Sequence, residues 1–505
     1  MSSVNTTQVD FKLLIEPWIK INKSYLIKGL TINSQDVKKD FLFIAINGEK
    51  HTSNDFIKDA IKNGATCILK ETNSDLEDRS IEYSDNCLVV KIKNLKNILS
   101  DIGGRFYNYP SKNHRIIGVT GTNGKTSITH IIAQWLDLLG QKSTIMGTNG
   151  SGELNNLKPS INTTGNPISI QKNIHDFVTI GSKITAMEVS SHGLVQHRVK
   201  NINFDVGIFT NLSRDHLDYH KTMESYEKSK FLFFSTHNVK NMVLNYDDLV
   251  GQKWSKKLND CFLISIKNYD LSSLTKNYIY VKNIRYVGQK TLLICASHLT
   301  EFEIEINLLG SFNITNVLLS LASLLLLGFK LDDLINTAEK LVSVEGRMEI
   351  FHNYDNPTVV VDYAHTPDAL HKALSSLSLK KGKIWCVFGC GGDRDRGKRV
   401  EMGRIADNLS DKLILTNDNP RTEDPKLILD DIMSGIKDKT NLHVIPDRGK
   451  AIQYAIDKAD QNDIIMVAGK GHENYQIIGD KKIVFSDRDE VKKALGLKND
   501  TNSIK

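Results

Sequence analysis

A glycine-rich turn between an apolar strand and a helix most constrains what this chain can fold into. Residues Ile116 to Val119 form an apolar run, the turn TGTNGKT follows from Thr120 to Thr126, and a helical pattern runs from Ser127 to Leu139. Glycines let backbone N–H groups approach phosphates, and the N-terminus of the helix adds a favourable dipole. The segment therefore predicts an α/β domain that binds a nucleotide.

Two side chains of this turn suit a phosphate site. Lys125 would neutralise the β- and γ-phosphate oxygens, and the Thr126 hydroxyl could ligate Mg²⁺. The spacing departs from GxxxxGK[ST] because Val119 stands where that pattern has its first glycine, so the loop is a shortened variant. A glycine turn without a nucleotide is the alternative. The nucleotide contacts that we expect from the turn are Gly121, Thr122, Asn123, Gly124, Lys125, Thr126 and Ser127.

The order of patterns predicts three α/β units with mostly parallel sheets. Short apolar runs around a helix-like stretch, from Leu26 to about Val90, suggest a small first unit. A second unit opens near Asn94, and a third begins after Gly346 with apolar strands that each end in a polar loop. A length of 505 residues fits three domains of about 150 residues. We place the domains at residues 1–94, 95–344 and 345–505.

The composition disfavours several classes of protein. Hydrophobic residues make up 40% and charged residues 25%, and the net charge of +6 is spread along the chain, which argues against disorder and a nucleic-acid footprint. The six cysteines show no CxxC spacing, which indicates reduced thiols. Residues Met1 to Trp18 lack the apolar run of a signal peptide, and Val317 to Phe329 is too short to span a bilayer. We expect a buried core helix there, and a cytoplasmic protein without membrane insertion or a nucleic-acid partner.

Polar residues follow two further predicted strands, Ile184 to Val189 and Val206 to Thr210. Glu188 could meet the metal of a bound nucleotide, and a buried carboxylate paired with an arginine is the alternative. A second histidine follows His216 by four residues, but Leu217 stands where HExxH requires glutamate, so a zinc-protease site is excluded. His216 could be a neutral metal ligand, or else a helix-capping residue or a polar residue with its hydrogen bonds satisfied.

Motifs along nearly the whole chain, from about Thr31 to Arg488, resemble those of the Mur ligases of bacterial cell-wall synthesis. In chain order they are TGTNGKT, MEVSSHGL, FTNLSRDHLDYH, YEKSK, GRME, DYAHTPDAL, GCGGDRDRGKR, DNPR and GKGHE. The last three make the chain most similar to the members that add the third residue of the peptide. The resemblance implies an α/β fold of three domains, with a central P-loop ATPase domain and a C-terminal Rossmann-like domain.

The resemblance implies an ATP-dependent ligase, expected to be a monomer, that joins UDP-N-acetylmuramoyl-L-alanyl-D-glutamate to meso-diaminopimelate. A carboxylate is a poor acyl donor because oxide would have to leave, so an acyl phosphate forms before the amine attacks. The family scheme assigns catalysis to Lys125, Glu188, His216 and Lys230. It assigns Mg²⁺ to Thr126, Glu188, His216 and Lys230, the last as a carbamate made with CO₂. In isolation, Lys230 would be expected on the exposed face of a helix.

The resemblance also assigns residues to three ligands. For ATP it adds Asn313, Arg347 and Asp362 to the turn. The sugar-nucleotide positions are Ile32, Ser34, Glu49, Lys50, His51, Asn162, Thr163, Thr164, Ser190, Gln196 and Arg198. The diaminopimelate positions are Arg394, Asp418, Asn419, Pro420, Arg421, Gly469 and Glu473. Because diaminopimelate has one carboxylate more than L-lysine, and an arginine fork binds a carboxylate bidentately, Arg421 favours the diaminopimelate type.

Four alternatives stay open at this point. The same ligase could use L-lysine, against which Arg421 argues. Another ligase of the fold, such as a folate polyglutamate ligase, is opposed by the last three motifs. A nucleotide-driven switch or nucleic-acid motor is opposed by the unclustered charge. A scaffold without catalysis would not need Lys125, Glu188, His216 and Lys230 together.

Overall fold

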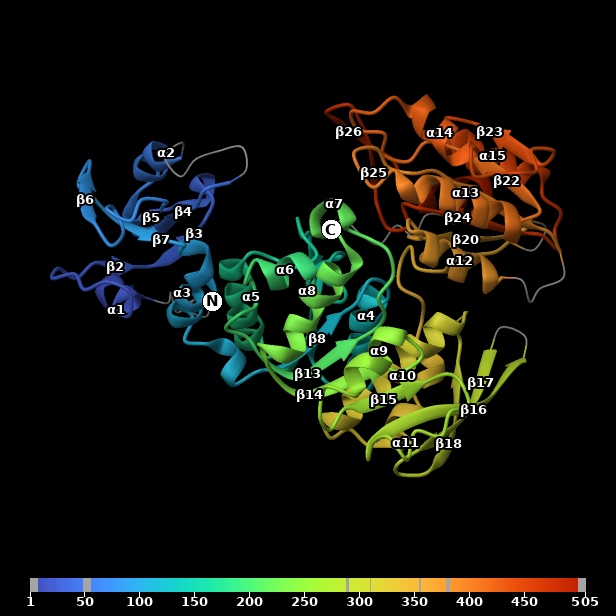
Figure 1. Cartoon of the computed structure of the whole chain (residues 1–505), viewed down its shortest axis with the longest axis horizontal. Helices are drawn as coiled ribbons and strands as arrows, with labels where there is room; N and C mark the ends of the chain where they lie inside the picture. The colour runs from blue at the N-terminus through green and yellow to red at the C-terminus, as the bar shows by residue number, and fades with distance from the viewer. Residues whose placement is uncertain are drawn as a thin grey trace. The chain divides into compact units, whose positions relative to one another are not determined.

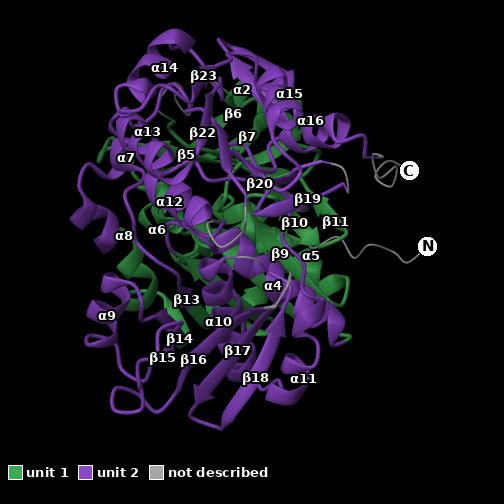
Figure 2. Ribbon diagram, turned by 90° about the vertical axis from the view of Figure 1, so that its right-hand side faces the viewer, with its two compact units in different colours: residues 1–120, 140–207, 229–241 green, residues 121–139, 208–228, 242–505 purple. Residues whose placement is uncertain are grey.

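The computed structural model of the chain describes residues 8–48, 56–287, 290–308, 310–353, 356–377 and 382–497. These residues fall into two compact units, which Figure 2 colours separately. Unit 1 comprises Met1–Thr120, Gly140–Gly207 and Ser229–Asn241. Unit 2 comprises Gly121–Leu139, Ile208–Lys228 and Met242–Lys505. Each unit is described by itself below.

The first part of unit 1 is a five-stranded sheet with helices on both faces (Figure 1). Its elements are β1 (Val9–Asp10), α1 (Phe11–Ile15), β2 (Leu26–Ile27), β3 (Gly29–Thr31), η1 (Ser34–Asp36), β4 (Phe41–Ala45), α2 (Ile57–Lys62), β5 (Ala65–Thr72), β6 (Ile81–Ser84), β7 (Cys87–Lys93), η2 (Leu95–Ile98) and α3 (Leu99–Phe106). The strand order is β3-β4-β5-β7-β6, and only β6 runs antiparallel to its neighbour. Alternate residues of β4 face opposite sides: Leu42 packs with α1 and α3, and Phe43 packs with α2.

The second part of unit 1 carries parallel strands that end at one edge. Its elements are η3 (Pro110–Lys112), β8 (Arg115–Thr120), β9 (Ser143–Gly147), β10 (Gly150–Glu153), β11 (Asn156–Lys158), α5 (Pro167–Thr179), β12 (Ile184–Glu188) and α6 (Ser191–Val195). The strands lie in the order β11-β10-β9-β12-β8, with β9, β12 and β8 parallel. The residues that follow β9 and β12 therefore meet at the carboxyl edge, where ligands bind in such sheets.

The first part of unit 2 combines the helix of the predicted phosphate loop with a mixed sheet. Its elements are α4 (Lys125–Leu138), α7 (Leu217–His220), α9 (Leu249–Ser255), β15 (Phe262–Ser265), β16 (Tyr278–Val287), β17 (Lys290–Ser297), β18 (Glu301–Ile306), α10 (Ser311–Leu326), α11 (Leu331–Ile335) and η4 (Ala338–Lys340). Three elements begin in one unit and end in the other, namely β13 (Asn203–Phe209), α8 (Met223–Ser235) and β14 (Asn238–Asn245). Strands β16, β17 and β18 form an antiparallel meander (Figure 1). Helix α10 packs on α4.

The last part of unit 2 has three layers, with a sheet between two sets of helices (Figure 1). Its elements are β19 (Glu349–Phe351), β20 (Thr358–Asp362), α12 (Pro367–Ser375), β21 (Ile384–Phe388), α13 (Gly397–Leu409), β22 (Lys412–Leu415), α14 (Pro425–Met433), β23 (Leu442–Val444), α15 (Arg448–Lys458), β24 (Ile464–Ala468), β25 (Tyr475–Ile478), β26 (Lys481–Val484) and α16 (Asp487–Ala494). The strand order is β19-β20-β24-β21-β22-β23, parallel except for β19. Along β21, Cys386 faces α12 to α14 and Trp385 faces α15 and α16.

These elements confirm the predicted α/β class and the strand, turn and helix at the phosphate loop. Most of the apolar segment from Val317 lies in α10, and it is buried up to Leu324, as predicted for a core helix. The six cysteines are free and buried, which agrees with reduced thiols. Among the described helices, none has the length and apolarity that crossing a membrane requires. The domain boundaries at 94 and 344 stay predictions.

Candidate active site

The predicted phosphate loop lies directly before and at the start of α4 in unit 2. Gly121 and Gly124 have φ of 146° and 91°, a conformation that favours glycine. A Cβ on Gly121 would lie 1.9 Å from Thr210 Oγ1, so no larger residue fits there. Lys125 Nζ donates to the carbonyl oxygens of Gly121 and Thr122, both at 2.8 Å. The loop thus has the glycine-dependent shape, and the ammonium beside it, that a phosphate cradle needs.

Two residues that follow β13 brace the loop. Thr210 Oγ1 donates to the Asn123 carbonyl at 2.6 Å, and Asn211 Oδ1 accepts from the Asn123 N–H at 3.0 Å. The Thr122 N–H donates to the Asn211 carbonyl at 2.8 Å. Sequence reasoning quoted this segment only as part of a motif and did not assign either residue to the site. Their position directly after a predicted parallel strand is the signal that could have identified them.

A cavity of about 260 Å³ opens beside the loop within unit 2. Five of the predicted ATP contacts line it, namely Asn123, Gly124, Ser127, Arg347 and Asp362. Other lining residues that sequence reasoning did not assign include Asn245, Asp248, Ile266, Lys267, Phe312 and Lys372. Asn313 is buried in α10, where its Oδ1 accepts from Asn316 Nδ2 at 3.4 Å, and it does not line the cavity. The cavity joins polar groups near the loop to apolar surface, as a nucleotide requires.

Arg347 and Asp362 give the cavity a cation and a carboxylate. Arg347 Nη2 donates to Thr126 Oγ1 at 3.4 Å, and its guanidinium lies 4.3 Å from the centre of the Tyr363 ring. Asp362 Oδ2 accepts from the Met348 N–H at 2.7 Å. Burial raises the pKa of Asp362, and the charge of Arg347 opposes that rise.

Glu188 ends β12 in unit 1, and its side chain is 1% exposed. The Thr148 N–H donates to Glu188 Oε1 at 2.8 Å, and Thr148 Oγ1 lies 3.2 Å from Oε2. Thr148 Oγ1 also lies 3.1 Å from Thr163 Oγ1. Sequence reasoning missed Thr148. The signal was available because Thr148 directly follows β9, which pairs in parallel with β12.

Several predicted sugar-nucleotide residues gather around Thr164 in unit 1. Thr164 Oγ1 donates to the Glu188 carbonyl at 2.9 Å and accepts from the Ser190 N–H at 2.9 Å. Arg198 Nη1 donates to the Thr164 carbonyl at 2.6 Å, and Arg198 Nη2 donates to Gln196 Oε1 at 2.6 Å. These four predicted residues therefore belong to one network with Glu188.

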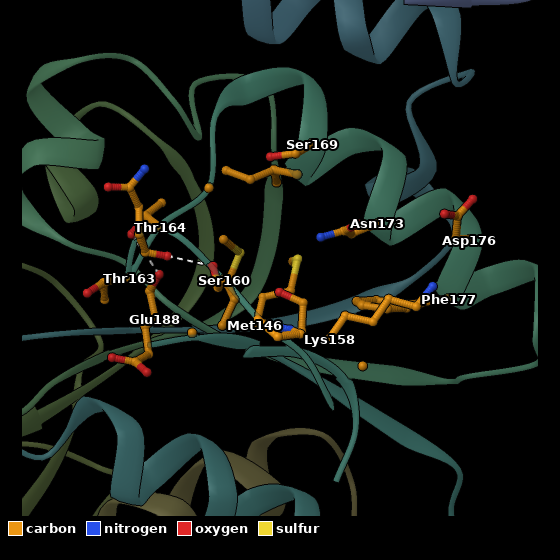
Figure 3. A pocket seen from close by; sticks show the side chains of 18 of the residues that line it. Met146, Lys158, Ser160, Thr163, Thr164, Ser169, Asn173, Asp176, Phe177 and Glu188 are labelled. Carbon is orange, nitrogen blue, oxygen red and sulfur yellow. Dashed lines mark hydrogen bonds between the residues drawn. The ribbon is translucent and has the colours of Figure 1, made fainter. Parts of the chain in front are cut away.

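A pocket of about 540 Å³ in unit 1 is lined by Asn162. Thr163, Thr164 and Glu188 line it as well (Figure 3). Its other end is formed by residues of α5, among them Asn173, Asp176 and Phe177, which Figure 3 shows away from Glu188. The pocket thus extends beyond the predicted sugar-nucleotide residues to α5.

The remaining sugar-nucleotide predictions fall elsewhere. Ile32 packs against the core of the five-stranded sheet, and Ser34 starts η1, where its carbonyl accepts from Asn63 Nδ2 at 3.0 Å. The three residues Glu49, Lys50 and His51 lie outside the described residues.

Lys230 and His216 differ in exposure. Lys230 lies in α8 with 1% of its surface exposed, so the expectation of an exposed helix lysine is wrong. His216 is exposed and precedes α7, but its side chain makes no capping hydrogen bond, which argues against the capping alternative. His216 Nε2 lies 3.4 Å from Asp215 Oδ2. Burial pushes the pKa of Asp215 up, but His216, His365 and Lys398 outweigh it and hold that pKa low.

The donor atoms suit Mg²⁺ better than zinc. Within the described ranges, no three His, Cys, Asp or Glu side chains cluster as a metal site. Mg²⁺ is typically held by one or two carboxylates together with substrate phosphates and water. In unit 1, the buried carboxylate of Glu188 is an oxygen donor of that kind.

The predicted diaminopimelate residues follow three neighbouring parallel strands of unit 2. Arg394 comes after β21, Asp418 to Arg421 after β22, and Gly469 and Glu473 after β24. Asn419 Nδ2 donates to Glu473 Oε2 at 2.9 Å, and a Cβ on Gly469 would lie 2.7 Å from Asp418 Oδ2. The structure thus brings these loops together at one sheet edge.

Arg421 has a left-handed backbone conformation, and its side chain contacts a neighbouring loop. It has φ of 53°, and its Nη1 donates to the Gly392 carbonyl at 2.7 Å. Burial, followed by the charge of Arg394, lowers the pKa of the Arg421 guanidinium. Pro420 is buried, Arg421 is half-buried and Arg394 is exposed.

An ion pair between buried Arg399 and half-buried Glu423, which sequence reasoning missed, supports the same loops. Arg399 donates through Nη2 and Nη1 to Glu423 Oε1 and Oε2 at 2.9 Å and 3.0 Å, and Glu423 Oε1 accepts from the Asp393 N–H at 2.5 Å. The hydrogen bonds from Arg399 lower the pKa of Glu423 to about 2. Arg399 Nη2 also donates to the Gly391 carbonyl at 3.3 Å, so this pair links the loops after β21 and β22.

Comparison with known proteins places the chain among the Mur ligases. Three family models match it: "Mur ligase family, catalytic domain" over residues 26–107, "Mur ligase middle domain" over residues 119–324, and "Mur ligase, glutamate ligase domain" over residues 346–471. A curated relative from Buchnera aphidicola subsp. Acyrthosiphon pisum is 45% identical over 493 residues, 97% of this chain and 99% of the relative. That relative is named UDP-N-acetylmuramoyl-L-alanyl-D-glutamate--2,6-diaminopimelate ligase.

Solved structures agree with this assignment. One described by the same enzyme name is 34% identical, with a TM-score of 0.67, and the match covers 97% of this chain and 99% of that one. A Thermotoga maritima MurF ligase solved in complex with ADP shares the fold, with a TM-score of 0.65 at 18% identity, over 87% of this chain and 93% of that one. These likenesses confirm the predicted three-domain architecture. The chain belongs to the Mur ligase family.

Proposed function

We propose that this chain is an ATP-dependent ligase that adds meso-diaminopimelate to UDP-N-acetylmuramoyl-L-alanyl-D-glutamate. The observation that carries the proposal is the loop Asp418 to Arg421, which meets Glu473 at one sheet edge in a chain that matches diaminopimelate ligases over its full length. The names of those relatives favour this substrate over L-lysine and over folate.

The first chemical step is phosphorylation of the glutamyl carboxylate by ATP. Both reactants are anions, so the site must offset their repulsion while the phosphoryl group transfers. Lys125 beside the phosphate loop and Arg347 beside Thr126 supply positive charge on this chain's own side chains. The apolar residues Ile266 and Phe312 of the same cavity suit the adenine ring.

The metal and the modified lysine belong to the same step. Thr126, Glu188, His216 and Lys230 would hold Mg²⁺, which neutralises phosphate charge when bound. Thr148 fixes the Glu188 carboxylate for this role. Lys230 is buried rather than exposed on the surface of its helix, which agrees with a role inside the site.

The second step is attack of the amine on the acyl phosphate. The expected sugar-nucleotide residues around Thr164 lie in one network with Glu188, which suits a substrate whose carboxylate must reach the phosphate. Arg421 and Arg394 would bind the carboxylate that distinguishes diaminopimelate from L-lysine. Glu473 would bind an ammonium group of the same substrate. Because the reaction consumes ATP, we also propose that it takes place in the cytoplasm. We propose, from the resemblance alone, that the protein is a monomer.

Phosphate release by the purified protein tests the proposal. The assay contains ATP, Mg²⁺ and the UDP-muramoyl dipeptide, with meso-diaminopimelate and L-lysine compared side by side. We expect turnover with diaminopimelate, and we expect Arg421→Ala to lose the preference by more than about tenfold, since a charge-assisted contact exceeds about 1.4 kcal/mol. Arg404→Ala, at an exposed position of α13, is the matched control. Equal use of both amines by the unmutated protein would remove the role of Arg421.

A further inference from the structure

We infer that Lys470 is a positioning residue of the amino-acid pocket, whose ammonium fixes Glu473 so that one carboxylate oxygen faces the incoming diamino acid. The inference rests on the proposed function, because it concerns the pocket assigned there to diaminopimelate. Lys470 belongs to the GKGHE motif, but neither sequence pattern nor resemblance gave it a role in binding.

The surroundings of Lys470 require it to be paired. The residue is 0% exposed and directly follows Gly469 at the carboxyl end of β24. A charged ammonium without partners is very costly at such a position. Lys470 Nζ donates to Glu473 Oε2 at 2.9 Å and to Asn419 Oδ1 at 3.2 Å, and it lies 3.9 Å from Asp418 Oδ1. Three predicted ligand-binding residues therefore surround this one ammonium.

These contacts occupy one side of the Glu473 carboxylate. Oε2 accepts from Asn419 Nδ2 at 2.9 Å as well as from Lys470. Oε1 has no hydrogen bond or ion pair to any residue that the structure describes. A carboxylate with one oxygen held by two donors cannot rotate without losing both, so Oε1 keeps a fixed direction.

Asn419 is committed to the same arrangement. Its Oδ1 accepts from the Ile477 N–H at 3.0 Å in addition to Lys470, and its Nδ2 donates to Glu473. The side-chain amide thus links the loop after β22 to the loop after β24. Because both ends of this amide form hydrogen bonds within the protein, we infer that Asn419 supports the pocket by holding Glu473.

The consequence for binding follows from charge and orientation. Lys470 offsets one of the two carboxylates, Asp418 and Glu473, so that the pocket is not strongly negative when a zwitterionic diamino acid enters. Without the ammonium, Glu473 keeps only the donor from Asn419, and the charges of Asp418 and Glu473 are no longer offset. When the diamino acid binds to such a variant, the Glu473 side chain must first be ordered, whereas in the native pocket it is already ordered. This ordering weakens binding.

Steady-state kinetics of Lys470→Met, Glu473→Gln and the double variant test this inference. Methionine keeps the length of the side chain and removes the charge. We expect Lys470→Met to raise KM for diaminopimelate at least about tenfold, with KM for ATP and for the UDP-muramoyl dipeptide within about twofold. Lys481→Met, at an exposed lysine of β26, is the matched control and should leave all three constants unchanged.

The double variant decides whether Lys470 acts through Glu473. If it does, adding Lys470→Met to Glu473→Gln raises KM for diaminopimelate by no more than about twofold beyond Glu473→Gln alone. This comparison also holds if Lys470→Met fails to fold, because the double variant leaves no unpaired carboxylate at Glu473. Independent, multiplying effects, or a parallel rise of all three KM values, would overturn the inference. Failure of the unmutated protein to use diaminopimelate would instead overturn the proposed function, and this inference with it.

Discussion

Replacing Thr148 by valine tests how the Glu188 carboxylate is held. Valine keeps the size and branching of the side chain, and the backbone N–H that donates to Glu188 Oε1 at 2.8 Å remains. The variant loses Oγ1, which lies 3.2 Å from Oε2. Thr148 Oγ1 carries one proton and also lies 3.1 Å from Thr163 Oγ1. Because a carboxylate can only accept, the Thr148 hydroxyl donates to Glu188 when the Thr163 hydroxyl donates to Thr148, and the variant then loses a bond to a charged group. At this length we assign it about 1.5 kcal/mol, which is roughly a tenfold effect.

The assay measures both turnover and metal binding. We expect Thr148→Val to lower kcat roughly tenfold and to weaken Mn²⁺ binding in the presence of ATP, followed by electron paramagnetic resonance. Thr148→Ser retains the hydroxyl and should restore most of both properties. A melting temperature unchanged from the unmutated protein would separate this effect from unfolding. If Thr148→Val matches the unmutated protein in turnover and in Mn²⁺ affinity, Thr148 does not position Glu188.

Two further variants test the modified lysine and the ion pair that supports the amino-acid loops. Lys230→Ala should be nearly inactive and partly rescued by a short carboxylic acid, and bicarbonate should support the unmutated protein; full activity of Lys230→Ala in bicarbonate-free buffer would contradict the carbamate. The pKa of Glu423 falls from 4.5 to about 2 on folding, so its contribution to stability is present above pH 4.5 and is lost as the pH falls toward 2. Thermal unfolding of Glu423→Gln should therefore give a lower melting temperature at pH 7 and a smaller decline between pH 4.5 and 2. An identical pH dependence in both proteins would exclude this role of Glu423.

The parts of the site that sequence predicted are those set by neighbouring residues in the chain. The turn from Thr120 to Thr126 is local, because two glycine conformations and a following helix define it. The alternation of apolar strands with polar loops likewise predicted the sheets, and it indicated that the loops after β21, β22 and β24 would carry ligands.

The parts that sequence did not predict depend on contacts between distant segments. Thr148 meets Glu188 only because β9 pairs with β12, and Lys470 meets Asn419 only because β24 and β22 flank β21. The burial of Lys230 could not be read from its segment, where polar neighbours are typical of an exposed helix face. Likewise, Arg399 ends the motif GCGGDRDRGKR, but nothing in the sequence indicates that it pairs with Glu423, 24 residues further along the chain.

The most direct test of the account is the coupling of ATP consumption to amide formation by the phosphate loop. With the UDP-muramoyl dipeptide, ATP and meso-diaminopimelate, we expect the unmutated protein to form ADP and the tripeptide product in equal amounts. Lys125→Ala should lose nearly all of both, because Lys125 supplies the ammonium that lies at the loop carbonyls of Gly121 and Thr122. Product formation by Lys125→Ala at the rate of the unmutated protein would contradict the account.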